Sequence, residues 1–316
     1  MFSFGIDLGG TNIAAGLVDD QGKIVCKKSV PTGRTREADE IVADMAKLLE
    51  AILADCGKTW NDVCFVGIST PGIANQETLC VDYSCNLPFL RYPLVEKLKA
   101  LIPMKNVGFE NDANAAAKGE AEVGAAKGAA DSVFITLGTG VGGGVIIDHK
   151  IYRGFNFAGT ELGHIVIVKD GEPCGCGRKG CWEAYSSATG LIRMTKKKML
   201  EAPSSKMWEI AGGDINKVNG KTSYDGLRAG DEAARQVVDE WVDYLACGLT
   251  NIVNIFQPEI LSIGGGISKE GELLLAPLRE KINSEQYAKN SDRKTEYKIA
   301  QLGNDAGIIG AAMLYR

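Results

Sequence analysis

The sequence predicts an α/β protein with two domains that flank a cleft. At 316 residues, 45% of them hydrophobic, the chain exceeds the usual single domain of about 100 to 200 residues. Short apolar runs bounded by glycine alternate with stretches of helical periodicity, which is typical of α/β proteins. The opening pattern of strand, glycine turn, strand, acidic turn and strand also restarts at Ser132, which indicates an internal duplication.

The first half is expected to open with a three-stranded meander over residues 2–30, because glycine and acidic turns separate the apolar runs there. Residues 37–56 place apolar side chains at intervals of three and four, which predicts an amphipathic helix with Thr35 as its cap. The elements expected next are a buried strand at 63–69, a helix near 94–102, a strand at 106–110 and a helix that opens at Asn111.

The second half is expected to repeat the meander from Ser132 and to continue with helices from about Thr189. The remaining elements expected are a long amphipathic helix at 231–256, a buried strand at 259–266, a further helix, a strand near 297–302 and a closing helix at 305–315. We therefore place an N-terminal domain at residues 1–115, closed by the helix at 305–316, and a C-terminal domain at 116–304.

Composition narrows the classes of function. The formal net charge is −5, and no basic run is longer than Lys196 to Lys198, so a nucleic-acid partner is not expected. No stretch of about 18 apolar residues occurs, so no membrane span is expected. The first residues lack the basic segment of a signal peptide, and we expect a cytoplasmic protein, in which disulfides rarely persist.

Three glycine-rich turns predict phosphate binding. In "DLGGTN" two glycines let backbone N–H groups approach an anion, the next two side chains add donors, and Asp7 is placed to hold a hydrated magnesium ion. "LGTGVGGG" offers a second such turn in the second half, and "GGGIS" follows a buried strand and precedes a helix, which suits a nucleotide. An ordinary hairpin turn is the alternative interpretation, and none of the three is a Walker A motif. The nucleotide-binding residues expected are Asp7, Gly9, Gly10, Thr11, Asn12, Gly138, Thr139, Gly140, Gly264, Gly265 and Gly266.

A cysteine cluster, "CGCGRKGCWE", indicates a metal site. Cys174, Cys176 and Cys181 supply three thiols in the spacing C-x-C-x4-C, and His164 lies ten residues before the first of them. A Cys3His set is suited to structural zinc and leaves no coordination position for catalysis. A redox-active thiol pair and unligated buried cysteines remain as alternatives.

The segment "ENDAN" places Asn111 and Asp112 where a strand is expected to become a helix. A carboxylate in this position usually caps the helix, with a benefit of roughly 1 kcal/mol. From the residues alone, capping is the favoured interpretation of Asp112.

Five motifs together resemble one protein family. "GIDLGGTNIAAGLVD", "ENDANAAAKGE", "LGTGVGGGVI", "GTELGHIVI" and "CGCGRKGCWEAYSS" stand in the order seen in ROK proteins, the bacterial sugar kinases and sugar-responsive repressors. The resemblance covers nearly the whole chain. It implies the actin-like ATPase (ribonuclease H-like) fold, in which two facing glycine turns clamp the phosphates of ATP.

The resemblance also implies roles for individual residues. Asp112 matches the catalytic base of the family, and zinc is held by the residues that match the Cys3His set, beside the sugar pocket. The implied sugar ligands are Gly72, Asn86, Asn111, Asp112, Glu161, His164 and Glu183. The expected activity is transfer of the γ-phosphoryl group of ATP to the 6-hydroxyl of a hexose, with glucose as the expected substrate, by a homodimer or homotetramer that uses Mg²⁺ and structural Zn²⁺.

Several alternatives stay open. Many ROK proteins carry a tryptophan shortly after the Asn-Leu pair of "NLP", whereas this chain reads "NLPFLRYPL", with Phe89, Leu90 and Tyr92, so the sugar could be fructose, mannose, allose or an N-acetylhexosamine. ADP or polyphosphate could replace ATP. A repressor is disfavoured because Phe2 already lies in the first strand, with no helix-turn-helix before it, and a filament protein of the actin type would need neither the zinc set nor Asp112.

The other cysteines and the second histidine are expected to be structural. His149 falls at a turn, where solvation is expected. Small core residues are expected at Cys26, Cys56, Cys64, Cys80, Cys85 and Cys247.

Overall fold

The computed structural model describes residues 1–33, 35–84 and 86–316, so the prediction for Cys85 lies outside the described residues. The chain forms two compact units. Unit 1 comprises Met1–Phe134, Gly144–Thr160 and Gln301–Arg316, and unit 2 comprises Ile135–Gly143 and Glu161–Ala300. The proposed boundary at residue 115 stays a prediction.

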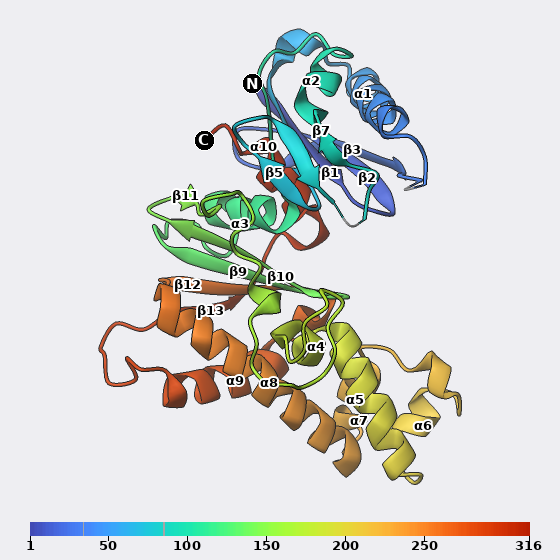
Figure 1. Cartoon of the computed structure of the whole chain (residues 1–316), viewed down its shortest axis with the longest axis vertical. Coiled ribbons are helices and arrows are strands. Elements are labelled where there is room, and N and C mark those ends of the chain that lie inside the picture. Colours follow the sequence, from blue (N-terminus) through green and yellow to red (C-terminus); the bar gives the residue numbers. More distant parts are fainter. Residues whose placement is uncertain (34, 85) are drawn as a thin grey trace. The chain divides into compact units, whose positions relative to one another are not determined.

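The sheet of unit 1 has the order β3-β2-β1-β4-β8 (Figure 1). The bounds of its strands are β1 (Phe2–Leu8), β2 (Asn12–Val18), β3 (Ile24–Pro31), β4 (Val63–Thr70) and β8 (Val107–Asn111). β1 pairs antiparallel with β2, and β2 with β3, which confirms the predicted meander. β4 lies parallel to both β1 and β8, so the carboxyl ends of these three strands share one edge of the sheet.

Helices cover both faces of this sheet. Phe4, Ile6 and Leu8 of β1 belong to the core under α1 (Ala38–Asp55). The alternate residue Gly5 faces α10 (Ala306–Ala312), because successive strand residues point to opposite faces. A Cβ at Gly5 would stand 1.8 Å from the backbone oxygen of Ile308. The closing helix predicted at the end of the chain therefore packs directly on the strand that begins it.

Three short elements between β4 and β8 were not predicted. β5 (Ile73–Asn75), β6 (Cys80–Tyr83) and β7 (Leu90–Tyr92) form a small antiparallel sheet that precedes α2 (Leu94–Lys99). Strands of three or four residues are too short to show a clear alternation in the sequence.

Helix α3 (Asp112–Val123) begins directly after β8 and packs against α10. Buried Glu120 on α3 accepts hydrogen bonds from the backbone N–H groups of Ala125, Gln301 and Leu302, at 2.7 to 3.1 Å. This carboxylate fastens the start of the last chain segment to the end of α3.

A second five-stranded sheet has the order β11-β10-β9-β12-β13. The bounds are β9 (Ser132–Leu137), β10 (Val141–Ile147), β11 (Lys150–Ile151), β12 (Ile260–Gly265) and β13 (Glu296–Ile299). The predicted strand near 297–302 therefore ends three residues early. The boundary between the two units passes through β9 and β10.

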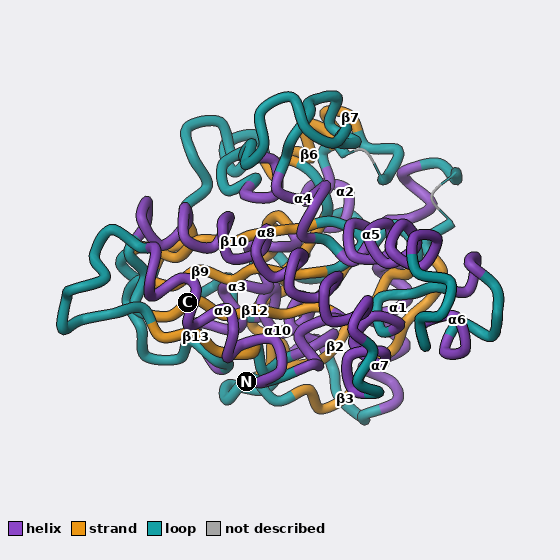
Figure 2. The backbone as a smooth tube through the Cα atoms, turned by 90° about the horizontal axis from the view of Figure 1, so that it is seen from below, coloured by secondary structure: helices purple, strands orange, loops and turns teal. Residues whose placement is uncertain are grey.

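The long helix α8 (Glu232–Phe256) lies among the other helices of unit 2 in Figure 1, and Figure 2 shows these helices from below. The helices in contact with it are α4 (Trp182–Ser186), α5 (Ala188–Glu201), α7 (Thr222–Arg228) and α9 (Glu272–Glu285), while α6 (Met207–Ile210) packs on α7. Asp231 caps α8 by accepting the N–H of Ala234 at 2.8 Å. The prediction of a helix at 231–256 is thus confirmed with its cap.

One detail of the prediction was wrong. Thr35 does not cap α1, because the N-cap position falls on Glu37, which makes no side-chain capping bond. The glycine segment after β12 precedes a helix as predicted, since it leads into a 3₁₀ helix, Gly266–Glu270, which α9 follows. In the part of the chain that the structure describes, no helix is long and apolar enough to cross a membrane.

Candidate active site and metal centre

The first glycine turn joins β1 to β2 and is held from outside by Thr32. The Gly9 N–H donates to the Asn12 oxygen at 3.0 Å, which closes the turn. Buried Thr32 donates its N–H to the Thr11 oxygen at 2.8 Å and its hydroxyl to the Gly9 oxygen at 2.6 Å. Because carbonyl groups of the turn are engaged in this way, its shape is set before any ligand binds.

Asp7 lies at the end of β1, beside this turn. The Ser69 hydroxyl of β4 donates to one of its carboxylate oxygens at 3.1 Å. Burial raises the pKa of Asp7 to about 6, the Ser69 hydrogen bond lowers it in part, and the negative charge of Asp112 raises it further. The two carboxylates therefore interact electrostatically, which is a suitable arrangement for holding a cation.

The β8–α3 junction shows which side chain caps helix α3. Asn111 is the N-cap of α3, because its side-chain oxygen accepts the N–H groups of Ala113 and Asn114 at 3.0 and 3.2 Å. Asp112 is the first residue of the helix, and one of its oxygens accepts the N–H of Ala113 at 2.8 Å. The capping role assigned to Asp112 from the residues alone thus falls mainly to its neighbour.

The pKa of Asp112 is raised, chiefly by desolvation, although hydrogen bonds from the backbone and from Asn111 lower it in part. The Asp112 side chain is exposed to solvent, but protein atoms surround its carboxyl group closely enough to desolvate it. A carboxylate that is costly to ionise, and still accessible, is a suitable proton acceptor.

The other predicted sugar ligands of unit 1 lie around this junction and the first turn. Asn111 donates its side-chain amide to the Gly72 oxygen at 3.2 Å. Asn86 is exposed. It lies next to the first turn, because a Cβ added at Gly10 would stand 3.4 Å from the Cβ of Asn86. Phe89 is buried and stacks on Tyr92 with ring centroids 4.8 Å apart. The residues that replace the expected tryptophan therefore belong in part to the core of unit 1.

The second glycine turn, in unit 2, is held from outside in a similar way. The Gly138 N–H donates to the Gly140 oxygen at 3.0 Å. The Ala188 N–H donates to the Gly138 oxygen at 2.9 Å, and the Thr189 hydroxyl to the Thr139 oxygen at 2.8 Å. The start of α5 thus fixes the carbonyl groups of this turn, as Thr32 does in the first.

Glu183 connects the second turn to the cysteine cluster. One of its carboxylate oxygens accepts the Val141 N–H at 3.0 Å, and the other lies 3.6 Å from the sulfur of Cys174. A Cβ at Gly140 would stand 2.2 Å from the first of these oxygens, so only glycine leaves room for the carboxylate here. A predicted sugar ligand is therefore held in place by a predicted phosphate turn.

The third glycine segment, Gly264 to Gly266, also lies in unit 2. A Cβ at Gly265 would stand 2.2 Å from the backbone oxygen of Leu137, the last residue of β9. The Ser268 hydroxyl donates to the Gly265 oxygen at 2.8 Å. This segment thus passes close to the strand that leads into the second turn.

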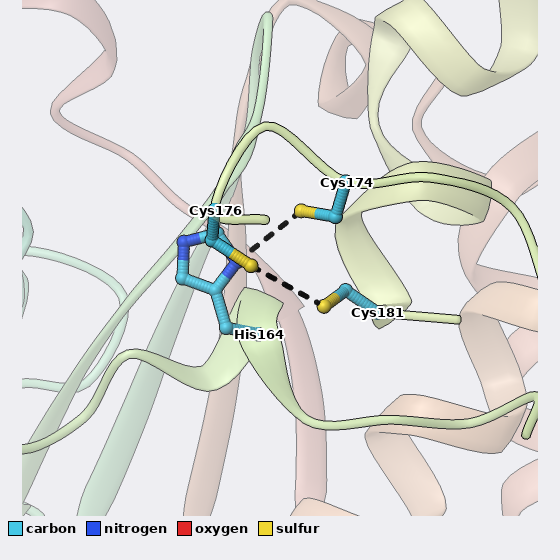
Figure 3. Close-up of side chains that lie close together, drawn as sticks. All are labelled: His164, Cys174, Cys176 and Cys181. Carbon is cyan, nitrogen blue, oxygen red and sulfur yellow. Dashed lines mark hydrogen bonds between the residues drawn. The ribbon is translucent and has the colours of Figure 1, made fainter. Parts of the chain in front are cut away.

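The four predicted metal ligands come together. The ligand atoms of His164, Cys174, Cys176 and Cys181 all lie within 4.8 Å of one another. Figure 3 shows the four side chains close together. Nδ1 of His164 is 3.6 Å from the sulfur of Cys174, and the sulfurs of Cys176 and Cys181 are 3.7 Å apart. Bond lengths of about 2.3 Å to sulfur and about 2.0 Å to nitrogen require donors about 3.5 to 3.8 Å apart around tetrahedral zinc. The donor set is therefore compatible with zinc in type and number, and these two donor pairs have the spacing of a tetrahedral site.

Hydrogen bonds from the chain itself shape this centre. The Cys174 N–H donates to the Arg178 oxygen, and the Arg178 guanidinium donates to the His164 oxygen, both at 2.9 Å. Trp182, between the last cysteine and Glu183, is fully buried against α8, and its indole N–H donates to the Tyr244 oxygen at 3.1 Å. The loop is thus anchored on both sides of the ligands. Burial also raises the pKa of the Cys174 thiol to about 12, so metal binding there must displace a proton.

The comparisons with known proteins agree with this geometry. The model of the ROK family matches residues 3–316. This chain belongs to the ROK family. A glucokinase of Streptomyces coelicolor is 38% identical over 316 residues, which cover 99% of this chain and 97% of that protein. A glucokinase of Thermotoga maritima is 38% identical over 314 residues and is covered to 96%.

The fold is that of the ROK kinases. The crystal structure of a ROK family glucokinase from Streptomyces griseus, in complex with glucose and AMPPNP, superposes with a TM-score of 0.82 at 35% identity. The superposition covers 99% of each chain. The expected α/β architecture of the actin-like type is thereby confirmed.

Several supporting residues of this ROK protein escaped the sequence analysis. Thr32 and Ser69 lie outside the five motifs, and Trp182 lies inside one of them. Each makes a side-chain hydrogen bond that helps to hold a motif in place. A lone threonine or serine carries no spacing signal, so only the folded chain reveals such roles. The supporting role of Trp182 was the most predictable of the three. A large apolar side chain between two polar site residues is costly to expose to solvent, so its burial is expected.

The residues expected to be structural behave mostly as predicted. His149 is exposed in the turn between β10 and β11. Among the described cysteines outside the cluster, each is half-buried rather than fully buried: Cys26, Cys56, Cys64, Cys80 and Cys247. These five cysteines lie at the margins of the core, which explains why they are half-buried rather than fully buried.

Proposed function

We propose that this ROK protein is an ATP-dependent hexose kinase that transfers the γ-phosphoryl group of ATP to the 6-hydroxyl of glucose. The glucokinases of two organisms, each 38% identical over nearly the whole chain, support this substrate. The Streptomyces griseus relative binds glucose together with an ATP analogue, which supports the donor. The site observation that carries the proposal is the accessible carboxylate of Asp112, whose pKa is raised and whose helix is capped by its neighbour.

Asp112 is the general base in this proposal. A neutral hydroxyl is a poor nucleophile, so a carboxylate accepts its proton as the phosphoryl group is transferred. Desolvation raises the pKa of Asp112, which makes it a better proton acceptor than an ordinary surface aspartate. At neutral pH the carboxylate must still be ionised to act.

The glycine turns bind the phosphates. Around both turns, carbonyl groups are engaged by other parts of the chain, while backbone N–H groups remain the natural partners of an anion. Asp7 would hold the magnesium ion of the nucleotide, which supplies charge neutralisation of the phosphates. We assign Gly264, Gly265 and Gly266 to the rest of the nucleotide.

On the resemblance to the family, we assign the sugar hydroxyls to the polar groups of Gly72, Asn86, Asn111, Glu161, His164 and Glu183. Such a set suits a polyol, because each buried hydroxyl left unpaired costs about 1 to 3 kcal/mol. In the cluster Nδ1 of His164 faces the cysteines, so Nε2, on the other side of the ring, is the atom we assign to the sugar.

Zinc has a structural role in this proposal. Four protein ligands complete a tetrahedral shell, so no position remains for a reacting group. We also propose a homodimeric or homotetrameric enzyme of the cytoplasm with no nucleic-acid partner, on the resemblance to the family. Elemental analysis tests the zinc assignment, and a content well below one ion per chain would contradict it.

The experiment for the function is ADP release from Mg-ATP with glucose, mannose, fructose, allose, N-acetylglucosamine and N-acetylmannosamine. We expect the fastest turnover with glucose and a loss of about 100-fold or more in Asp112→Asn. ADP and polyphosphate are run as alternative donors. Turnover with another sugar would correct the substrate, and binding of a sugar without turnover on any donor would favour a sensor.

A further inference from the structure

A buried carboxylate stands directly before the residues proposed for catalysis. Glu110 is the last residue but one of β8 and is almost completely buried. One of its oxygens accepts the Asn111 N–H at 3.0 Å and the side-chain amide of Asn114 at 3.2 Å. The other accepts Nε of Arg153 at 2.5 Å.

The same group of residues holds a surface segment at both of its ends. Arg153 begins the segment 153–160, and the side-chain oxygen of buried Asn114 accepts the hydroxyl of Thr160 at 3.2 Å. Within the segment, the Gly159 N–H donates to the Arg153 oxygen at 2.9 Å, which closes it into a loop. Glu161, one of the proposed sugar ligands, follows Thr160 directly in the sequence.

The chemistry of this network favours a role in positioning. A buried carboxylate is expensive unless it is paired and hydrogen-bonded, and here each oxygen has a partner. Those partners are the N-cap residue, the third residue of α3 and the start of the loop. Glu110 therefore holds the backbone of Asn111 and the side chain of Asn114, which lie before and after Asp112 in the sequence.

Another ion pair, on α3, provides a comparison. Lys118 donates to Glu122 at 2.6 Å near the end of this helix, and both side chains are largely buried. Neither belongs to a turn or to a group of proposed ligands. The two ion pairs are similar in chemistry, and they differ in what they touch, since Glu110 lies at the end of β8 and Glu122 near the end of α3.

We propose that Glu110 and Arg153 are positioning residues for phosphoryl transfer, which fix the orientation of Asn111 and Asp112 and hold the loop before Glu161. The proposal rests on the function proposed above. Glu110 touches no reacting atom in it and acts through the residues that it binds.

The variant that tests it is Glu110→Gln, which keeps the shape of the side chain but removes the charge that pairs with Arg153. We expect kcat to fall about 10- to 100-fold, because a small misplacement of a reacting group has effects of this size. The KM for ATP should change little, since the network does not touch the glycine turns. Glu122→Gln is the control and should leave kcat within about twofold, whatever its effect on the melting temperature.

Arg153 supplies a second set of variants, because its side chain is about one third exposed and its replacement is less disruptive to folding. We expect Arg153→Met to lower kcat, and Arg153→Lys to recover part of the loss, since an ammonium group keeps the charge but not the geometry of the guanidinium. Equal kcat values for the Glu110→Gln and Glu122→Gln proteins, or for the Met and Lys variants of Arg153, would overturn the proposal.

A readout that needs no turnover separates this proposal from the proposed function. The titration of the Asp112 carboxyl can be followed by carbon-13 NMR, with Asp112→Asn to assign the signal. We expect the titration curve to move in the Glu110→Gln protein and to stay in place in the Glu122→Gln protein. If no sugar is phosphorylated, the function fails. If the Asp112 curve is the same in both variants, the positioning role fails.

Discussion

Two acidic residues of unit 1 have carboxyl pKa values that the folded chain raises, and the cause is mainly burial. The pKa of Asp7 rises to about 6, and that of Asp112 is also raised. Ionised at neutral pH, each of them lowers the stability of the folded state. The functions proposed for them account for this cost, since a cation and a hydroxyl proton both need a carboxylate as a partner.

The first prediction concerns Asp7→Asn. The folded pKa of about 6 lies above the ordinary value of 3.8, so ionisation destabilises the fold at high pH, and the cost disappears as pH falls through 6 toward 4. Without added magnesium, the variant should be more stable than the wild type at pH 8, by at most about 3 kcal/mol. Urea unfolding at several pH values measures this. A gain that did not shrink on acidification would contradict the assignment to Asp7.

A second prediction uses the space at Gly140. In Gly140→Ala the new Cβ would stand 2.2 Å from the oxygen of Glu183 that binds the Val141 N–H. The carboxylate must move, and the affinity for glucose should fall about tenfold. Calorimetry without nucleotide measures this.

The matched control is Gly138→Ala in the same turn, because its Cβ would have no neighbour within 4 Å. Its affinity for glucose should stay within about twofold of the wild type. Similar losses in both variants would show that Glu183 is not the residue affected.

At the scale of elements, each of the two glycine turns depends on a neighbour outside its motif. Thr32 follows β3 and holds the first turn, and the start of α5 holds the second. The strands and turns were predictable because glycine and apolar periodicity mark them. The contacts that hold them come from segments 20 to 50 residues away, and the sequence pattern carries no sign of them.

The third prediction tests the support of the first turn. Thr32→Val keeps the shape of the side chain but removes the hydroxyl that donates to the Gly9 oxygen at 2.6 Å. Stability should fall by about 1 kcal/mol, and the KM for ATP should rise several-fold, because the turn loses part of its fixed shape. Thr32→Ser keeps the hydroxyl and should retain the KM of the wild type. If both variants behaved alike, the hydroxyl would not be the cause.

At the scale of the whole molecule, unit 1 is completed by the last sixteen residues of the chain. Helix α10 lies directly on β1 and β4, where Gly5 and Gly67 leave no side chain between strand and helix. Folding of unit 1 therefore requires contacts between the two ends of the sequence, which is a slow step by the criterion of contact order.

The fourth prediction is that Gly67→Ala destabilises the protein by at least about 2 kcal/mol, because overpacking forces the helix away from the sheet. Its Cβ would stand 1.8 Å from the backbone oxygen of Ala311. Gly220→Ala, with no neighbour within 4 Å, is the control and should change stability by less than about 0.5 kcal/mol. Thermal unfolding of both proteins provides the comparison, and equal melting temperatures would contradict close packing of α10.

The sequence alone determined the α/β class, the two glycine turns, the long helix α8 and the grouping of the four candidate metal ligands, because local spacing or composition indicates each of them. Local spacing also identified the segment that carries Asp112. Its role was ambiguous in the sequence, since a carboxylate at a helix start can serve as a cap.

Only the tertiary structure assigned the cap to Asn111, joined Glu183 to the second turn, and surrounded Glu110 with Asn114 and Arg153. These facts depend on side chains from distant segments that meet in space. These interactions are stabilised by burial and hydrogen bonding in the folded state, and neither produces a periodic pattern in the sequence.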